Sequence, residues 1–510
     1  MRVIRRALPV VLVFITLVGT AVAESAKVHV NWEKVTRVSE TFPSLLCVEN
    51  PLYRRNSPIH DKVFAALKGL NADYVSHLGW FPYPKLVVAE LEPPRDGKTF
   101  WDFAQLDPIM IDFFEATKGH PVMVNFSTIP EWMFKTPQPV SYPDDPDKVD
   151  WLYPQGTELR DSTRKELADY YARLANWYTQ GGFTDEYGKW HESGHHYKID
   201  YWGVLNEIDL EHFTTPEEYT ARYDAIVEAV RKVSPGTKFA GMMLALPTKN
   251  PRYFEYFLDP KNHKPGIPVD MVGYHFYGLP AADESPDVQQ FTYFAMADQF
   301  LDVVRYIEQI RKRLSPQTRT IINELGIILP SDFAQGSPGY VWKPEDPGYR
   351  NRYAAMYAYM FAQLVRMGID VAAESQLLGF PGQFSSVSML DAKTGEPNAT
   401  YWVLSMLIQN LRPGDKLVDS RVEMPGAVPF LPAYVDAIAF VKPDGTRKVL
   451  LINKRNRPFE VTVPGAAKGT MQALGADSKP PAVSTLESDT FDLGPMGVGV
   501  VTLPAVAARP

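Results

Sequence analysis

Short apolar runs alternate with longer amphipathic stretches between residues 41 and 412. The short runs have the length and composition of buried strands. There are eight of them: SLLCV (44–48), ADYVSHL (72–78), PVMVNF (121–126), IDYWGVL (199–205), TKFAGMM (237–243), VDMVGYHF (269–276), RTIIN (319–323) and IDVAAES (369–375). The longer stretches have helical periodicity, as in residues 57–70, 161–180, 215–233, 287–314 and 349–368. Eight strands alternating with helices predict a (β/α)₈ TIM barrel over 41–412, with a doubly wound sheet as the alternative.

The pattern changes after about Pro413. Helical periodicity gives way to short β-like runs such as AYVDAIAFV, KVLLINK and PFEVTV, separated by Pro/Gly turns. These runs predict an antiparallel β-sandwich over 413–510. Residues 24–40, which alternate apolar with polar positions, are expected to add an N-terminal strand to that sandwich.

The N-terminus has the layout of a secretory signal peptide. Three arginines precede an apolar run that ends in Ala21-Val22-Ala23, so cleavage is expected after residue 23. No other uninterrupted apolar segment approaches the roughly 18 residues needed to span a bilayer. We therefore expect a secreted or periplasmic protein with no membrane span in the mature chain; the sequence does not indicate its oligomeric state.

Composition narrows the class of partner. The formal net charge is −8 and the pI is near 5.8, which argues against nucleic acid because phosphate binding needs a basic surface. Cys47 is the only cysteine, so an internal disulfide and a multi-cysteine zinc site are excluded. Its apolar surroundings favour a place in the core.

One motif suggests zinc chemistry. His191, Glu192 and His195 match the H-E-x-x-H pattern of zinc peptidases, which requires the two histidines to share one face of a helix. Glycines at 181, 182, 188 and 194 surround and interrupt the motif, and no apolar stripe supports a helix. A polar loop leading into a strand is the favoured interpretation, and a zinc peptidase is the minor alternative.

Two glutamates follow predicted barrel strands. Glu207 follows the fourth strand and Glu324 the seventh, and the ends of these two strands face each other across a barrel mouth. A retaining glycosidase needs two such carboxyl groups, a protonated acid with a raised pKa and an ionised nucleophile. Asn206 can bind a sugar hydroxyl, and His275 or Tyr277 can orient Glu324. Taken singly, each glutamate could instead cap a helix or form a salt bridge.

This set of motifs resembles the clan A glycoside hydrolases, and most closely family 39, which includes β-xylosidases and α-L-iduronidases. The resemblance covers residues 40–505 and rests on these segments: Asn125-Phe126-Ser127 through Pro130-Glu131-Trp132-Met133, Asn206-Glu207, Tyr274-His275-Phe276-Tyr277 and Asn323-Glu324. It implies Glu207 as acid/base and Glu324 as nucleophile, Asn206 and Tyr277 in contact with substrate or nucleophile, and Trp132 as a sugar platform. An oligo- or polysaccharide substrate is implied, with no metal or cofactor.

The sequence departs from that family at two strand ends. The second strand ends in Ser76-His77 where an arginine is common, and the eighth has Glu374 and Gln376 where a tryptophan is common. Because strand ends line the mouth of a barrel, His77, Trp80, Glu49 and Asn50 are candidate substrate contacts. The missing arginine leaves open a second hypothesis, a barrel that binds carbohydrate without cleaving it.

Overall fold

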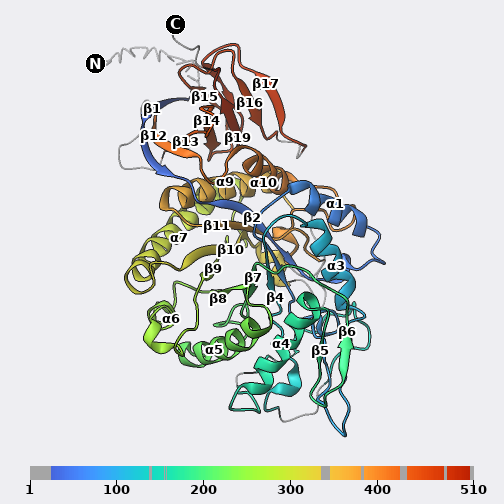
Figure 1. Ribbon diagram of the computed structural model, residues 1–510. Coiled ribbons are helices and arrows are strands. Elements are labelled where there is room, and N and C mark those ends of the chain that lie inside the picture. The colour runs from blue at the N-terminus through green and yellow to red at the C-terminus, as the bar shows by residue number, and fades with distance from the viewer. Residues whose placement is uncertain are drawn as a thin grey trace, which may run out of the picture.

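A closed barrel of eight parallel strands forms the centre of the molecule (Figure 1). The computed structural model describes residues 24–136, 141–153, 155–156, 158–334, 345–380, 384–424, 433–475 and 479–505. The predicted signal peptide lies outside these ranges. In barrel order the strands are β2 (Phe42–Val48), β3 (Val75–Leu78), β4 (Val122–Asn125), β7 (Tyr201–Gly203), β8 (Lys238–Leu244), β9 (Met271–Gly278), β10 (Arg319–Ile327) and β11 (Val371–Ser375).

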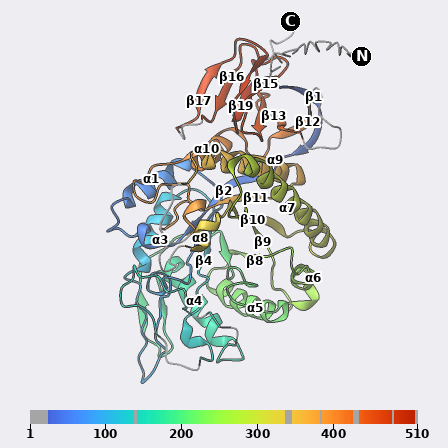
Figure 2. The same cartoon turned by 180° about the vertical axis from the view of Figure 1, so that it is seen from behind.

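A helix follows each barrel strand and covers the outside of the barrel (Figure 2). The eight are α1 (His60–Leu70), α3 (Leu106–Ala116), α4 (Lys165–Thr179), α5 (Pro216–Val233), α6 (Arg252–Phe257), α7 (Pro286–Leu314), α9 (Tyr349–Met367) and α10 (Ala399–Asn410). Thr215 and Glu218 form the capping box that starts α5. The predicted (β/α)₈ barrel is confirmed. The doubly wound alternative is excluded because the eight strands form one closed ring, in which β9 also pairs with β10.

The second unit is a nine-stranded, mainly antiparallel sheet. Its order is β17 (Ala482–Thr485), β16 (Thr470–Ala473), β19 (Val498–Thr502), β14 (Arg447–Asn453), β13 (Val435–Val441), β12 (Lys416–Glu423), β1 (Ser25–Val38), β15 (Phe459–Thr462) and β18 (Thr490–Leu493). The N-terminal strand β1 lies inside the sheet, antiparallel to β12 and parallel to β15. The predicted β-sandwich accompanying the barrel is thus confirmed as a fold class.

This sheet packs on the side of the barrel covered by α9 and α10 (Figure 1). Alternate residues of β14 serve two cores: Val449 and Leu451 pack inside the sandwich, while Leu450 and Ile452 join the core of the barrel. Arg366 of α9 forms an ion pair with Asp436 of β13 at the junction. The barrel and the sheet therefore share one continuous apolar interface.

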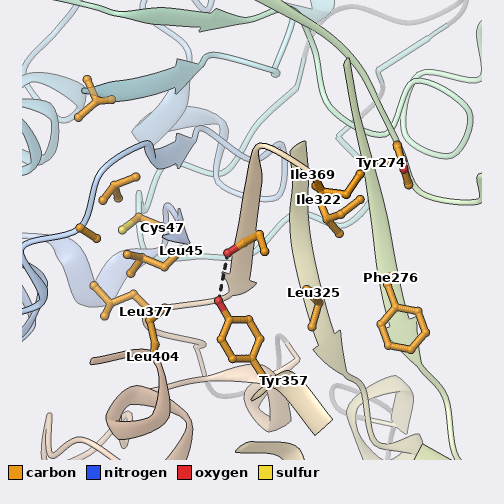
Figure 3. Close-up of a cluster of buried hydrophobic side chains, with 14 of the residues drawn as sticks. Leu45, Cys47, Tyr274, Phe276, Ile322, Leu325, Tyr357, Ile369, Leu377 and Leu404 are labelled. Carbon is orange, nitrogen blue, oxygen red and sulfur yellow. Dashed lines mark hydrogen bonds between the residues drawn. The ribbon is translucent and has the colours of Figure 1, made fainter. Parts of the chain in front are cut away.

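The main core lies between the barrel strands and the surrounding helices. Figure 3 shows part of it, with Leu45 and Cys47 of β2 close to Leu377 and Leu404, and with the Tyr357 hydroxyl donating to the Ala372 carbonyl over 3.0 Å. Burial raises the pKa of the Cys47 thiol to about 12. Among the described residues, no helix combines the length and the apolar character that a membrane span requires.

Candidate active site

Glu207 and Glu324 meet at the carboxyl ends of the barrel strands. Glu207 lies in the loop after β7, and Glu324 lies within β10. One carboxyl oxygen of each glutamate and one ring nitrogen of His275 from β9 lie within 4.8 Å of one another. Carboxyl groups about 5 to 5.5 Å apart are typical of retaining glycosidases, whereas inverting enzymes need a wider gap for water. The spacing therefore fits double displacement.

Irregular backbone delivers both glutamates. Leu205 and Glu207 have φ angles of +63° and +43°, a left-handed conformation that costs a side-chain-bearing residue about 1–3 kcal/mol. In β10 the register with β9 shifts between Ile322 and Glu324, so Asn323 forms a bulge. Such bulges re-aim side chains next to active sites. This explains why β10 extends four residues beyond the predicted end at Asn323 without carrying Glu324 away from the mouth.

Two neighbours on β9 contact the pair. His275 Nδ1 lies 3.0 Å from Glu207 Oε1 and 3.3 Å from Glu324 Oε2. The Tyr277 hydroxyl lies 2.6 Å from Glu324 Oε2, to which it donates, and 2.7 Å from Ser375 Oγ. Both residues contact Glu324, the carboxyl group that the sequence analysis expected them to orient. Hydrogen bonds of this kind favour an ionised carboxylate.

The two carboxyl groups differ in their surroundings. Burial, followed by the negative charge of Asp209, raises the pKa of Glu207 to about 8, so Glu207 is protonated at neutral pH. Burial also raises the pKa of Glu324, the carboxyl group that the sequence analysis expected to stay ionised. His275, Tyr277 and the Asn206 amide act in the opposite direction on Glu324. Protonation of Glu207 removes the charge that repels an ionised Glu324, so the pair favours one proton on Glu207.

Asn206 is fixed by a buried network that the sequence did not reveal. Its backbone N–H donates to Ser127 Oγ over 2.8 Å, and Ser127 Oγ lies 3.1 Å from His212 Nε2. Burial lowers the pKa of His212 to about 3, so its neutral ring can accept a hydrogen bond from the Ser127 hydroxyl. The side-chain amide is hydrogen-bonded to Glu324, while the Oδ1 of Asn206 is buried without a hydrogen-bond partner.

Trp80, a predicted substrate contact, lies in an aromatic wall beside a third carboxyl group that the sequence analysis did not place at the mouth. Trp80, half-buried in the loop after β3, has its ring centre 5.3 Å from that of Trp151 and 6.1 Å from that of Phe384. Its indole N–H donates to Glu211 Oε1 over 2.5 Å. These residues come from four separate loops, so only the folded barrel brings them together. The position of Trp80 after a predicted strand end, in "LGWFPY", was the signal that nominated it.

The structure places other predicted contacts elsewhere. Glu49 Oε2 and His77 Nε2 lie 3.1 Å apart. The centre of the His77 ring lies 5.4 Å from the ring centre of Phe113 in α3, so this pair faces the helices outside the barrel. Strand alternation explains the correction: Glu49 follows Leu45 and Cys47, which point outward, and His77 is paired with Cys47.

Asn50 and Trp132 are engaged in structural contacts. The Asn50 side chain caps a short 3₁₀ helix at Leu52 and donates to the Leu378 carbonyl. Trp132 is buried; its N–H donates to the Glu90 carbonyl, and the Arg160 guanidinium lies 4.5 Å from its ring centre. No contact joins either residue to Glu207 or Glu324 in the described part of the chain, so the sugar platform expected at Trp132 is better supplied by Trp80.

The H-E-x-x-H segment does not form a helix. His191 and Glu192 lie in β6 (Trp190–Glu192), which pairs with β5 (Gly182–Thr184) in a hairpin. His191 Nε2 bonds to Asp185 over 2.8 Å, and His195 Nε2 lies 3.3 Å from Asp107. The two histidines have different acidic partners, so the geometry required of a zinc peptidase is absent from this segment.

Glu207, His275 and Glu324 are also the one group in the described ranges whose donor atoms could surround a cation. One imidazole nitrogen and two carboxylate oxygens suit a divalent ion in type. The same atoms, however, already make the hydrogen bonds expected of an acid and a nucleophile. A chelator would distinguish the two interpretations, because it inhibits only a reaction that depends on a metal.

Comparisons with known proteins agree with this architecture. Residues 432–509 match a family model described as "D-apionate lactonase, C-terminal immunoglobulin-like domain". No curated protein matches the chain. Similar solved structures include a GH51 arabinofuranosidase from Xanthomonas axonopodis pv. citri (TM-score 0.62, 12% identity, 94% of this chain and 100% of that one). An α-L-arabinofuranosidase from Thermotoga maritima gives TM-score 0.62, 13% identity and the same coverages.

A GH30 xylanase C catalytic domain from Talaromyces cellulolyticus is more distant in shape, with TM-score 0.57, 12% identity and coverage of 94% of this chain and 100% of that one. All three are glycoside hydrolases with low sequence identity to this chain. The likeness therefore establishes the fold alone, the barrel with its accompanying β-domain. The family match concerns only the C-terminal domain.

Proposed function

We propose that the protein is a retaining glycosidase acting on an oligo- or polysaccharide. The observation that carries the proposal is the approach of the Glu207 and Glu324 oxygens to within 4.8 Å at the barrel mouth. Glu207, whose pKa is raised to about 8, protonates the glycosidic oxygen while Glu324 attacks the anomeric carbon. Glu207 then removes a proton from the water that hydrolyses the glycosyl-enzyme.

Other residues have supporting parts in this mechanism. Tyr277 and His275 hold the Glu324 carboxylate through hydrogen bonds. Asn206, with its free Oδ1, is placed to bind a hydroxyl of the reacting sugar, a contact that strengthens in the transition state. The assignment to family 39 is part of the proposal and rests on the four motif segments. Export after cleavage near Ala23 is a further part, and N-terminal sequencing of secreted protein tests it.

The decisive experiment compares Glu324→Ala and Glu207→Ala with aryl glycosides. Loss of the nucleophile should lower kcat by on the order of 10⁴-fold or more. Azide should restore turnover to Glu207→Ala with an activated aryl glycoside, because the anion needs no general base. A fully active Glu324→Ala enzyme would show that the assignment is wrong. Binding of sugar without turnover by the wild type would favour the non-catalytic alternative, and inhibition by EDTA would favour a metal.

Lactone hydrolysis is a second candidate, favoured by the match of residues 432–509 to the C-terminal domain of a D-apionate lactonase family. In that reaction a carboxylate of the pair activates water against an ester carbonyl, and no glycosyl-enzyme forms. Assaying aldonolactones beside aryl glycosides separates the two. Trapping a covalent adduct on Glu324 with a 2-fluoroglycoside would support the glycosidase alone.

A further inference from the structure

A third carboxyl group, that of Glu211, belongs to the same mouth. The Glu211 backbone N–H donates to the Glu207 carbonyl over 2.7 Å, so the two residues lie one helical turn apart in the loop after β7. Glu211 interacts electrostatically with both Glu207 and Glu324. Burial and these two charges raise the pKa of Glu211 well above its usual value. Three carboxyl groups thus share one poorly solvated space.

Glu211 connects parts of the site that are distant in sequence. Its carboxyl group accepts from the Trp80 indole over 2.5 Å and is hydrogen-bonded to the Asn206 side chain. Trp80 is the centre of the aromatic wall, whereas Asn206 also contacts Glu324. A change at Glu211 therefore acts on both the ring that can stack on a sugar and the amide that can bind its hydroxyl.

The mouth has acidic groups without balancing cations. In the ranges that the structure describes, the ion pairs of Glu207 and Glu324 are made with His275, and neither a lysine nor an arginine pairs with any of the three glutamates. A sugar bearing its own carboxylate would bring another negative charge into this space. With no cation beside it, that carboxylate would lie unpaired in a poorly solvated site and close to the ionised Glu324, and the cost of this arrangement rejects the charged ligand.

We propose that Glu211 positions Trp80 and Asn206 against a neutral sugar, in a mouth whose lack of cations excludes uronic acids. The inference rests on the proposed glycosidase function and deepens it by naming the substrate class. Glu211 is a positioning residue, because it acts through its hydrogen bonds to Trp80 and Asn206. Its raised pKa keeps its carboxyl group uncharged, so the discrimination comes from the missing cations and from the charge of Glu324.

The test compares wild type with Glu211→Gln on matched pairs of 4-nitrophenyl glycosides, in which each neutral hexoside is paired with the uronide of the same configuration. For the preferred configuration, wild type should cleave the neutral member with kcat/KM about 100-fold higher. Glu211→Gln should narrow that ratio about tenfold, mainly by raising KM of the neutral member, because a carboxamide presents one acceptor oxygen where the carboxyl group presents two. The alkaline limb of the pH profile should stay in place, because the raised pKa of Glu211 leaves it without a charge that acts on Glu207.

Glu192→Gln is the matched control. It makes the same chemical change on the exposed face of the β5–β6 hairpin and should leave both the ratio and the pH limb unchanged. Equal or faster cleavage of uronides by wild type would overturn the proposal, as would a Glu211→Gln enzyme with an unaltered ratio.

A binding measurement separates this proposal from the glycosidase assignment. Free neutral hexoses and their uronic acids are titrated while tryptophan fluorescence is measured, and a Trp80→Phe variant identifies the part of the signal that comes from Trp80 among the ten tryptophans. Preference for the neutral sugar, reduced in Glu211→Gln, supports the inference even if no glycoside is cleaved. Cleavage without any such preference supports the glycosidase and contradicts the inference. A protein that binds neither sugar contradicts it too.

Discussion

Carboxyl groups lie on both faces of the barrel wall, and their surroundings differ sharply. Glu207 and Glu324 face the mouth, where His275 and Tyr277 hold them. Glu374 of β11 is also at a strand end and fully buried, but its electrostatic neighbours are Tyr353 and Tyr357 of α9, and neither of its carboxyl oxygens has a hydrogen-bond partner. Position near a strand end is therefore not sufficient for function; the face of the strand decides which environment a carboxyl group meets.

The largest difference between the two faces should appear in activity. Glu207→Gln removes the general acid and should lower kcat/KM for a substrate with a poor leaving group by about 10²–10⁴-fold. The outward Glu374→Gln should change it less than about threefold. Wild-type activity should fall as pH rises through about 8, when Glu207 loses its proton, and this limb should disappear in Glu207→Gln. Comparable losses in both variants would break the distinction.

A smaller effect is expected from Tyr277, which supports the mouth carboxylate. Tyr277→Phe removes a hydrogen bond to a charged group worth about 1.5–3 kcal/mol, so kcat/KM should fall roughly 10- to 150-fold. Since that hydrogen bond lowers the pKa of Glu324, its loss should move the acid limb of the pH profile to higher pH. Steady-state kinetics at several pH values measures both. An acid limb that stays in place would mean that Tyr277 does not support the ionised nucleophile.

The smallest effect concerns stability at the outer face. Burial raises the pKa of Glu374 well above its unfolded value, so the folded protein holds this proton while the unfolded chain releases it. Stability from this group is present at low pH and is lost as pH rises above about 4.3 toward the raised pKa. Glu374→Gln should flatten the fall in stability between pH 5 and pH 8. Urea unfolding at the two pH values measures it, and an unchanged slope would contradict the burial argument.

The sequence was sufficient for the barrel because strand and helix periods alternate eight times. It was also sufficient to nominate Glu207 and Glu324, since a position at a strand end is visible in a one-dimensional pattern. It did not reveal the outward orientation of Glu49 and His77, because both faces of a parallel barrel strand are apolar and the usual alternation is lost. Counting in steps of two from Leu45 and Cys47 would have placed Glu49 outside.

Contacts between separate loops were beyond the reach of the sequence. Trp80 and Glu211 meet only because the loops after β3 and β7 converge at one end of the barrel. Ser127 and His212 likewise meet across two loops to hold Asn206. The bulge at Asn323 shows the same limit, since nothing in RTIINELGI marks where the register shifts. Fine positioning arises from packing and hydrogen bonding that depend on the completed fold.

The location of β1 has a consequence for how the chain reaches its native state. This strand is the first described element, yet its partners are β12 and β15, with Lys27 aligned to Glu423 and Ser25 to Glu460. During synthesis β1 stays unpaired until the whole barrel has been made, because both of its partner strands follow the barrel in the sequence. Pairings between such distant segments also form slowly. A C-terminal fragment starting at residue 413 would lack this inner strand and expose two bare edges, which invite aggregation. The barrel is thus topologically an insertion within the β-domain, and the two units depend on each other to be completed.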